Sequence, residues 1–122
     1  MAKTILIVDD SASMRQVVGI TLKAAGYDVI EGRDGKDALT KLTGQKVHLI
    51  VSDVNMPNMD GISFVTEVKK LPAYKFTPII MLTTETDETK KNEGRAAGVK
   101  AWVVKPFRPA QLLDAVQRLC LP

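Results

Sequence analysis

The sequence predicts a single α/β domain over residues 1–122, in which five parallel strands alternate with five helices. Four apolar runs, at 5–8, 47–51, 79–82 and 101–104, are continuous rather than alternating. Continuous runs of this length are typical of strands that are buried on both faces of a parallel sheet. Segments with helical periodicity separate them. A chain of 122 residues with 45% hydrophobic content is long enough to bury one core.

The first half of the chain predicts three strands and two helices. After the strand at 5–8, five positions share one helical face: Val17, Val18, Thr21, Leu22 and Ala25. Gly26 suits the left-handed end of that helix. A weaker run at 27–30 is interrupted by Asp28, which favours an edge strand. Asp34 can cap a helix at 35–43 that Gly44 ends, and the strand at 47–51 follows.

The second half repeats the alternation. Ile62, Val65 and Val68 share a helical face ahead of the strand at 79–82. The next helix, at 87–97, contains Gly94, and a glycine inside a helix costs about 1 kcal/mol relative to alanine. We therefore expect this helix to be the least firmly packed. Gly98 suits its end, and Pro109 suits the first turn of the last helix. That helix has an apolar face made of Leu112, Leu113, Val116 and Leu119.

Connections in such a fold are right-handed and place helices on both faces of the sheet. We predict a doubly wound sheet with the flavodoxin-like strand order 2-1-3-4-5. Ligands of such sheets bind beyond the carboxyl ends of the strands, where the strand order reverses. In this order the reversal lies between the first and third strands.

Composition argues against several classes of function. The chain has 17 Lys and Arg against 14 Asp and Glu, a net charge of +3, and its basic residues are spread along the sequence. Nucleic-acid binders usually concentrate such residues, so we expect no nucleic-acid partner. The single cysteine, Cys120, indicates a reducing compartment, and we interpret it as a small apolar residue of the last helix. No apolar run is long enough for a signal peptide or a membrane span. We expect a soluble, cytoplasmic protein.

Reactive side chains stand at the ends of four predicted strands. Asp9 and Asp10 follow the run 5–8, and Asp53 follows Ser52. Thr83 follows the run ending at Leu82, and Lys105 follows Val104. Because parallel strands end at the same edge of a sheet, these five side chains should converge on one crevice.

This set of groups is typical of phosphoryl chemistry. Three close carboxylates repel one another unless a cation lies among them, and Mg²⁺ prefers oxygen ligands. Asp9, Asp10 and Asp53 could supply these, with the backbone carbonyl of Asn55 as a further ligand. One carboxylate could then attack a phosphoryl group. Lys105 and Thr83 would contact the phosphoryl oxygens.

The whole chain resembles the receiver domain of two-component response regulators, of the CheY type most closely. The resemblance rests on residues 8–10, on 52–61 (Ser-Asp-Val-Asn-Met-Pro-Asn-Met-Asp-Gly), on Thr83 and on 105–107 (Lys-Pro-Phe). It implies that Asp53 is the phosphoacceptor, that Asp9 and Asp10 hold Mg²⁺, and that Lys105 and Thr83 contact the acyl phosphate. It also implies a cis peptide bond before Pro106.

The resemblance further implies which residues tune the site. The positions two past the acceptor and two past the threonine are Asn55 and Glu85, a polar and acidic pair that favours a phosphate lifetime of seconds to minutes. Thr84 departs from the smaller residue usual there and could hinder phosphodonors or phosphatases. Trp102 replaces the usual Tyr or Phe of the switch, and its larger ring could restrict the movement.

The function implied is that of a stand-alone regulator that catalyses only its own phosphorylation and dephosphorylation. Its partners would be a histidine kinase, a phosphatase, and a flagellar switch or chemotaxis protein bound through the fourth helix, fifth strand and fifth helix, with the chain a monomer. The alternative is a phosphorelay intermediate or an adaptor outside chemotaxis. Two other classes are disfavoured. An Asp-nucleophile phosphatase needs a second Asp where Asn55 stands, and a flavin-binding protein would not place Asp9 and Asp10 against a phosphate.

Overall fold

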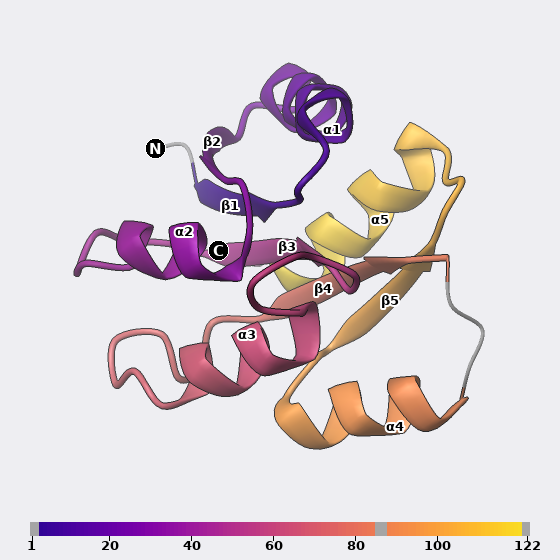
Figure 1. The fold of residues 1–122 in the computed structure, drawn as a ribbon. Coiled ribbons are helices and arrows are strands. Elements are labelled where there is room, and N and C mark those ends of the chain that lie inside the picture. The colour runs from indigo at the N-terminus through magenta and orange to yellow at the C-terminus, as the bar shows by residue number, and fades with distance from the viewer. Residues whose placement is uncertain (1–2, 85–87, 121–122) are drawn as a thin grey trace.

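Five parallel strands form one sheet in the order β2-β1-β3-β4-β5. The computed structural model describes residues 3–84 and 88–120. The strands are β1 (Thr4–Val8), β2 (Asp28–Gly32), β3 (Leu49–Asp53), β4 (Ile79–Thr83) and β5 (Ala101–Val104). The helices between and after them are α1 (Ala12–Ala24), α2 (Gly35–Lys41), α3 (Gly61–Lys69), α4 (Glu88–Ala97) and α5 (Pro109–Leu119). The predicted fold class and strand order are confirmed (Figure 1).

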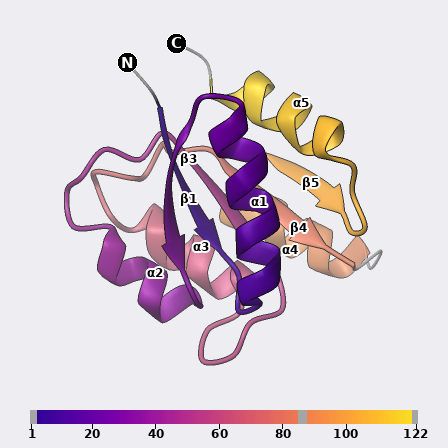
Figure 2. The same ribbon diagram turned by 90° about the horizontal axis from the view of Figure 1, so that it is seen from above.

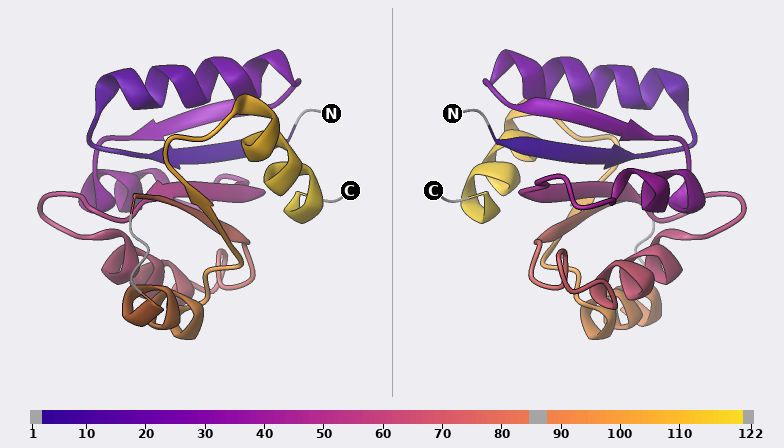
Figure 3. Two further views of the ribbon diagram at one scale, coloured as in Figure 1. Left: turned by 90° about the vertical axis from the view of Figure 1, so that its right-hand side faces the viewer. Right: turned by 90° about the vertical axis from the view of Figure 1, so that its left-hand side faces the viewer.

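The helices cover both faces of the sheet, α1 and α5 on one side and α2, α3 and α4 on the other (Figures 1 and 3). Neighbouring residues of one strand point into different cores. Leu6 and Ile50 pack with the residues of α2 and α3, whereas Ile5 and Leu49 pack with those of α1 and α5. Both cores exclude solvent from the strands, which explains why the apolar runs are continuous.

Most of the predicted capping residues lie at helix ends, although α2 ends at Lys41, before it reaches Gly44. The side chain of Asp34 accepts a hydrogen bond from the Asp37 N–H (2.8 Å) and caps α2. Gly26, Gly44 and Gly98 all have positive φ angles, of 96°, 101° and 116°. Pro109 is the first residue of α5.

Two details of the prediction are wrong. Val17 is 52% exposed and Ala25, the C-terminal cap of α1, is also exposed. The face of α1 that packs on the sheet instead contains Val18 and Leu22, with Met14 half-buried beside them. The cause is that Val17, Val18 and Ile20 are all apolar, so the pattern alone leaves the orientation of the helix open.

Several boundaries also shift by a few residues. β2 begins one residue later than predicted and extends to Gly32, and β3 covers 49–53 rather than 47–51. α2 ends at Lys41 instead of residue 43. Cys120 is buried against the α1–α5 core, as interpreted from the sequence. Within the described ranges, no helix combines the length and the apolar character that a membrane crossing requires.

The parallel arrangement gives the sheet two chemically different ends. The carboxyl ends of β1 and β3 lie together because Val8 pairs with Ser52. The amino ends of the strands meet the loops that precede β3, β4 and β5. Figure 2 shows the two loops before β3 and β4 running close together at the amino end, with the β3–α3 loop at the opposite end.

Candidate functional site

Three carboxylates meet at the carboxyl ends of β1 and β3. Asp9 and Asp10 follow β1, and Asp53 is the last residue of β3. Each offers an oxygen atom that lies within 4.8 Å of an oxygen of the other two. Asp9 is 2% exposed and Asp53 is 9% exposed, whereas Asp10 is open to solvent. The carboxylates predicted to converge at the ends of the first and third strands therefore do so, with Asp10 on the solvent side.

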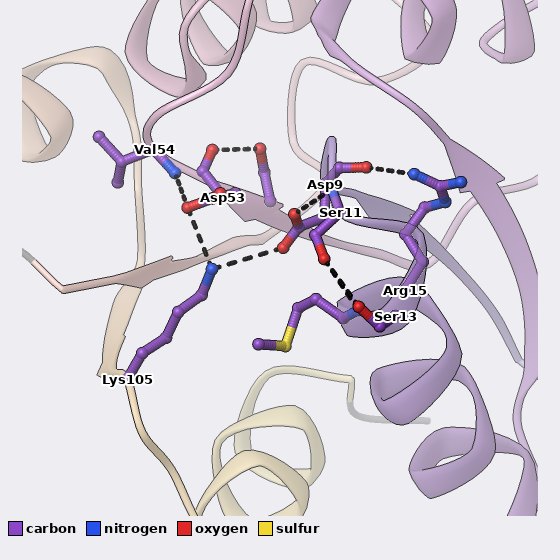
Figure 4. A network of polar contacts seen from close by, with 9 residues as sticks. Asp9, Ser11, Ser13, Arg15, Asp53, Val54 and Lys105 are labelled. Carbon is purple, nitrogen blue, oxygen red and sulfur yellow. Dashed lines mark hydrogen bonds and ion pairs between the residues drawn. The ribbon is translucent and has the colours of Figure 1, made fainter.

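Lys105 reaches into this cluster from the end of β5. Its Nζ lies 3.4 Å from Asp53 Oδ1 and 3.5 Å from Asp9 Oδ2. Figure 4 shows the ammonium group between the two carboxylates. The peptide bond that follows Lys105 is cis, as the resemblance implied. The backbone N–H of Lys105 also donates to the Thr83 carbonyl (2.7 Å), which ties the end of β5 to the end of β4.

Asp9 is held in place from several directions. Its Oδ1 accepts a hydrogen bond from the Ser11 N–H (2.9 Å), and Ser11 in turn caps α1. The guanidinium of Arg15 donates to the Asp9 carbonyl (2.7 Å) and also pairs with Glu31 (3.2 Å). These contacts join the β1–α1 loop to α1 (Figure 4), and the Arg15–Glu31 pair joins α1 to β2.

The backbone after Asp53 is closely packed. Asp53 Oδ1 accepts a hydrogen bond from the Val54 N–H (2.8 Å), which orients the carboxylate. Gly61 donates to the Val54 carbonyl (2.7 Å), and a Cβ atom on Gly61 would overlap the Asp53 carbonyl oxygen and lie 2.9 Å from Val54 Cα. Only glycine allows α3 to begin this close to the end of β3.

Burial raises the pKa of Asp9 above its ordinary value, and the negative charge of Asp53 adds to this effect. The Ser11 N–H and the Lys105 ammonium act in the opposite direction. Desolvation and like charge together outweigh them, so the cluster favours taking up a proton or another cation. A buried carboxylate whose pKa is shifted by a specific charged neighbour is a candidate for function on physical grounds.

The remaining predicted residues surround the cluster. Thr83 is fully buried at the end of β4, next to β3 and β5 in the sheet. Asn55 and Thr84 are exposed in the loops that follow β3 and β4. Glu85 lies outside the described residues. The structure thus groups Asp9, Asp10, Asp53 and Lys105 tightly, with Thr83 at the end of the adjacent strand.

Trp102 lies on β5, half-buried against α4. A Cβ atom on Gly94 would overlap the indole ring, so Gly94 is the point where the ring contacts the helix. The sequence indicated only that Gly94 lowers the stability of this helix. The structure shows that its missing side chain leaves room for the Trp102 ring. The indole Nε1 is buried without a hydrogen-bond partner among the described residues. A buried donor of this kind is unfavourable, so the ring would gain by reaching a partner.

Sequence reasoning did not identify Arg15 as part of the site. Its position offered a signal, because it lies one helical turn after the Ser11 cap and so can reach back to the strand end that precedes the helix. The signal is weak without the structure, since an arginine at such a position is usually solvated.

The donor set fits a hard divalent cation. The three clustered side chains offer carboxylate oxygens alone, and two of the three residues are buried. Burial raises the pKa of Asp9, and the neighbouring charge of Asp53 adds to this effect, so a bound cation would relieve both. Mg²⁺ prefers such ligands and keeps several waters, which the exposed Asp10 at the rim allows.

Comparison with known proteins agrees with this geometry. Residues 5–117 match the response regulator receiver domain family. The chain is 37% identical to chemotaxis protein CheY1 of Helicobacter pylori, over 93% of each chain. The structure of chemotaxis protein CheY4 of Vibrio cholerae is similar with a TM-score of 0.94 and 50% identity, covering 98% of this chain and 99% of that one.

A second similar structure is the receiver domain of a sensor histidine kinase from Pseudomonas aeruginosa, which has a magnesium ion coordinated in its active site cleft. It has a TM-score of 0.90 and 28% identity, over 98% of both chains. A family match over nearly the whole chain and relatives of this similarity decide the assignment: the chain is a CheY-type member of the response regulator receiver domain family, a phosphoacceptor signalling domain of two-component systems.

Proposed function

We propose that this protein is a phosphorylation-dependent switch in which Asp53 accepts a phosphoryl group from a histidine kinase. The observation that supports this most directly is the position of the Lys105 ammonium, 3.4 Å from Asp53 Oδ1 and 3.5 Å from Asp9 Oδ2. A cation in this place can contact a phosphoryl oxygen once Asp53 is modified. Asp53 itself lies at the strand end, oriented by the Val54 N–H.

Asp9, Asp10 and Asp53, together with the backbone carbonyl of Asn55, would hold Mg²⁺. When bound, this ion supplies positive charge that offsets the repulsion between the carboxylates and the phosphoryl oxygens. Arg15 and Ser11 contribute by fixing the Asp9 backbone and side chain. The magnesium ion in the similar kinase receiver domain supports this part of the proposal.

The transfer itself needs little from the protein beyond position and charge. A carboxylate oxygen of Asp53 forms a bond to phosphorus while the bond between phosphorus and the histidine nitrogen of the kinase breaks, and that nitrogen keeps the electron pair. Lys105 and the Thr83 hydroxyl contact the phosphoryl oxygens. Water later cleaves the acyl phosphate and regenerates Asp53. Asn55, Thr84 and Glu85 would set the rate of this step.

The output surface would be formed by α4, β5 and α5. A groove of about 780 Å³ lies along β5 and α5 and includes Trp102, Lys105 and Gln111 among its lining residues. The groove thus shares Lys105 with the acceptor site, and Trp102, which contacts α4 at Gly94, connects it to that helix. The names of the relatives favour a role in chemotaxis. The proposed partner is therefore a chemotaxis or flagellar switch protein, and a phosphorelay or adaptor role is the alternative. A cytoplasmic location and a monomeric chain are parts of the proposal.

Intact-mass spectrometry after incubation with acetyl phosphate and Mg²⁺ tests this function. We expect the chain to gain the mass of one phosphoryl group, and Asp53→Asn to gain none. Beryllofluoride with Mg²⁺ should change the fluorescence of Trp102, the only tryptophan of the chain, in the native protein but not in Asp53→Asn. A phosphoryl group found on another residue of the native protein would overturn the assignment of Asp53.

A further inference from the structure

Phe76 is the most exposed large hydrophobic residue among those described, with 89% of its surface open to solvent. It belongs to the loop between α3 and β4, at the amino end of the sheet and opposite the carboxylate cluster. Two hollows, of about 340 and 290 Å³, share Phe76 as a lining residue. The ring therefore forms a ridge between two concave surfaces. An exposed aromatic side chain in such a setting is a frequent feature of binding surfaces.

The charged residues around this ridge are basic. Lys46 lines the larger hollow, and Lys69, Lys75 and Lys100 line the smaller one. No Asp or Glu lines either hollow in the described part of the chain. The Lys75 ammonium also lies 5.7 Å from the centre of the Phe76 ring. We call these four lysines and Phe76 the lysine–Phe76 surface.

The positive charge of this surface has little compensation within it. Lys69 Nζ donates a hydrogen bond to the Thr77 carbonyl (2.6 Å), which is a neutral partner. Burial lowers the pKa of Lys69, and the nearby charge of Lys100 lowers it further. The two ammonium groups therefore repel each other, and a bound anion would relieve this repulsion.

The surface is built on loops that hydrogen bonds join. The hydroxyl of the buried Tyr74 donates to the Gln45 carbonyl and accepts from the Gly44 N–H, both at 2.8 Å. These bonds connect the loop before β4 to the loop before β3, and the two loops run close together in Figure 2. Because this connection is part of the fold, a ligand would meet the larger hollow already formed.

We propose that the lysine–Phe76 surface binds an acidic segment of a partner protein, at the end of the sheet opposite Asp53. An apolar side chain of that segment packs against Phe76, and its carboxylates lie near Lys75 and Lys100. Complementary charge and an exposed aromatic ring favour an acidic partner with an apolar residue. The hollows on both sides of the ridge favour protruding side chains over the flat surface of a bilayer. This site is independent of the phosphorylation proposed for Asp53.

Fluorescence anisotropy with a defined probe tests the proposal. The probe is a fluorescein-labelled peptide of sequence Glu-Asp-Glu-Asp-Leu-Phe-Asp-Glu-Glu, titrated with the full chain at low and at high salt. We expect saturable binding that weakens with added salt, because the charges involved are exposed. Phe76→Ala and Lys100→Gln should each raise the Kd by about tenfold, a change typical of the loss of one good contact. Beryllofluoride with Mg²⁺ should leave the Kd unchanged.

Matched controls separate this site from general charge attraction. Lys36→Gln removes one exposed charge at the other end of the molecule, and Ile20→Ala removes an exposed apolar side chain of α1, which is 61% exposed. Both should bind the peptide as the native chain does. A peptide with Gln and Asn in place of Glu and Asp should bind at least about tenfold more weakly. In NMR titrations the shifted amide signals should come from residues 44–48, 69–78 and 98–100.

Three results would overturn the proposal. The first is the absence of binding, or equal loss of binding in Lys36→Gln and Lys100→Gln. The second is a Kd that Phe76→Ala leaves unchanged. The third is tighter binding of phosphatidylglycerol-containing vesicles or of single-stranded DNA than of the peptide, with the same dependence on Phe76, which would assign the surface to membranes or nucleic acid. Because Phe76 and Lys100 are both exposed, their replacement should leave the fold intact, and thermal melting of each variant checks this.

Discussion

The two ends of the sheet differ in whether their clustered charges of the same sign have a counter-charge nearby. At the carboxyl end, Asp9 lies beside Asp53, and burial together with that neighbour raises its pKa. At the amino end, Lys69 lies near Lys100, and burial together with that neighbour lowers its pKa. The carboxyl end contains its own counter-charge, since Lys105 lies within 3.5 Å of both carboxylates. The Lys69 ammonium instead donates to a neutral group, the Thr77 carbonyl.

The difference indicates what each end does. A cluster with an internal cation and precise backbone anchors is suited to chemistry, because the reacting groups are held in place before a substrate arrives. A cluster without an internal counter-ion is suited to binding an external anion. Like charges lie close together at both ends of the sheet, and the presence or absence of a built-in partner separates the proposed phosphoacceptor end from the proposed docking end.

Removing the internal counter-charge should have the largest effect. Lys105→Met takes away the ammonium between Asp9 and Asp53, and we expect the rate of phosphorylation by acetyl phosphate to fall by about 100-fold, as for the loss of one charge-stabilising donor. The measurement is the rate of the mass increase at fixed Mg²⁺. Lys100→Met, at the opposite end, should leave this rate unchanged. Equal rates for Lys105→Met and the native chain would show that the two ends do not differ as described.

The next largest difference between the two ends is expected from backbone packing, measured as the cost in stability of replacing a glycine. Gly61→Ala places a Cβ atom against the Asp53 carbonyl and Val54, so we expect the free energy of unfolding to fall by about 2–3 kcal/mol. Gly44→Ala, at the amino end, meets nothing within 4 Å and should cost only about 1 kcal/mol, from its positive φ. Urea denaturation of both variants measures this. A larger loss in Gly44→Ala would contradict the view that the carboxyl end is the more tightly built one.

The fold and the acid cluster were predictable because they depend on local pattern. Continuous apolar runs and the residues that follow them place Asp9, Asp53 and Lys105 at one edge of a parallel sheet, and the structure brings them together. The lysine–Phe76 surface was not predictable in this way. It combines residues from separate loops, and no periodicity relates Phe76 to Lys100. The exposed position of Val17 was missed because adjacent apolar residues left the rotation of α1 undecided.

Neutralising Asp9 tests the difference between the two ends of the sheet through its effect on the free energy of unfolding. Asp9→Asn removes a buried charge beside Asp53 while its side-chain oxygen can still accept from the Ser11 N–H. We expect a gain of about 1 kcal/mol in the free energy of unfolding at neutral pH, together with loss of Mg²⁺ binding. The folded-state pKa of Asp9 is raised, so its destabilising effect is complete above that pKa. The effect disappears below the ordinary value of about 3.9, where the carboxyl is protonated in both states.

Thermal melting at a series of pH values checks this, with Mg²⁺ titration followed by Trp102 fluorescence. The gain in stability of Asp9→Asn should shrink as the pH falls toward about 3.9, the ordinary pKa of an aspartate. Asp114→Asn is the matched control, because Asp114 is exposed and pairs with Arg118 on the surface of α5. It should change stability by less than about 0.5 kcal/mol. A gain for Asp9→Asn that persists unchanged at low pH would refute the role of its charge.

The smallest effect is expected at the amino end. Lys100→Gln removes the charge that repels Lys69, so the pKa of Lys69 should rise toward its ordinary value while the hydrogen bond to the Thr77 carbonyl stays in place. Stability should change by less than about 0.5 kcal/mol, because Lys100 is exposed. NMR titration of the Lys69 side chain measures the pKa, with Lys36→Gln as the control that should leave it unmoved. Binding of the acidic peptide to the native chain should raise the same pKa, because a bound carboxylate favours the charged ammonium. A Lys69 pKa that responds to neither change would mean that the amino end carries no uncompensated charge.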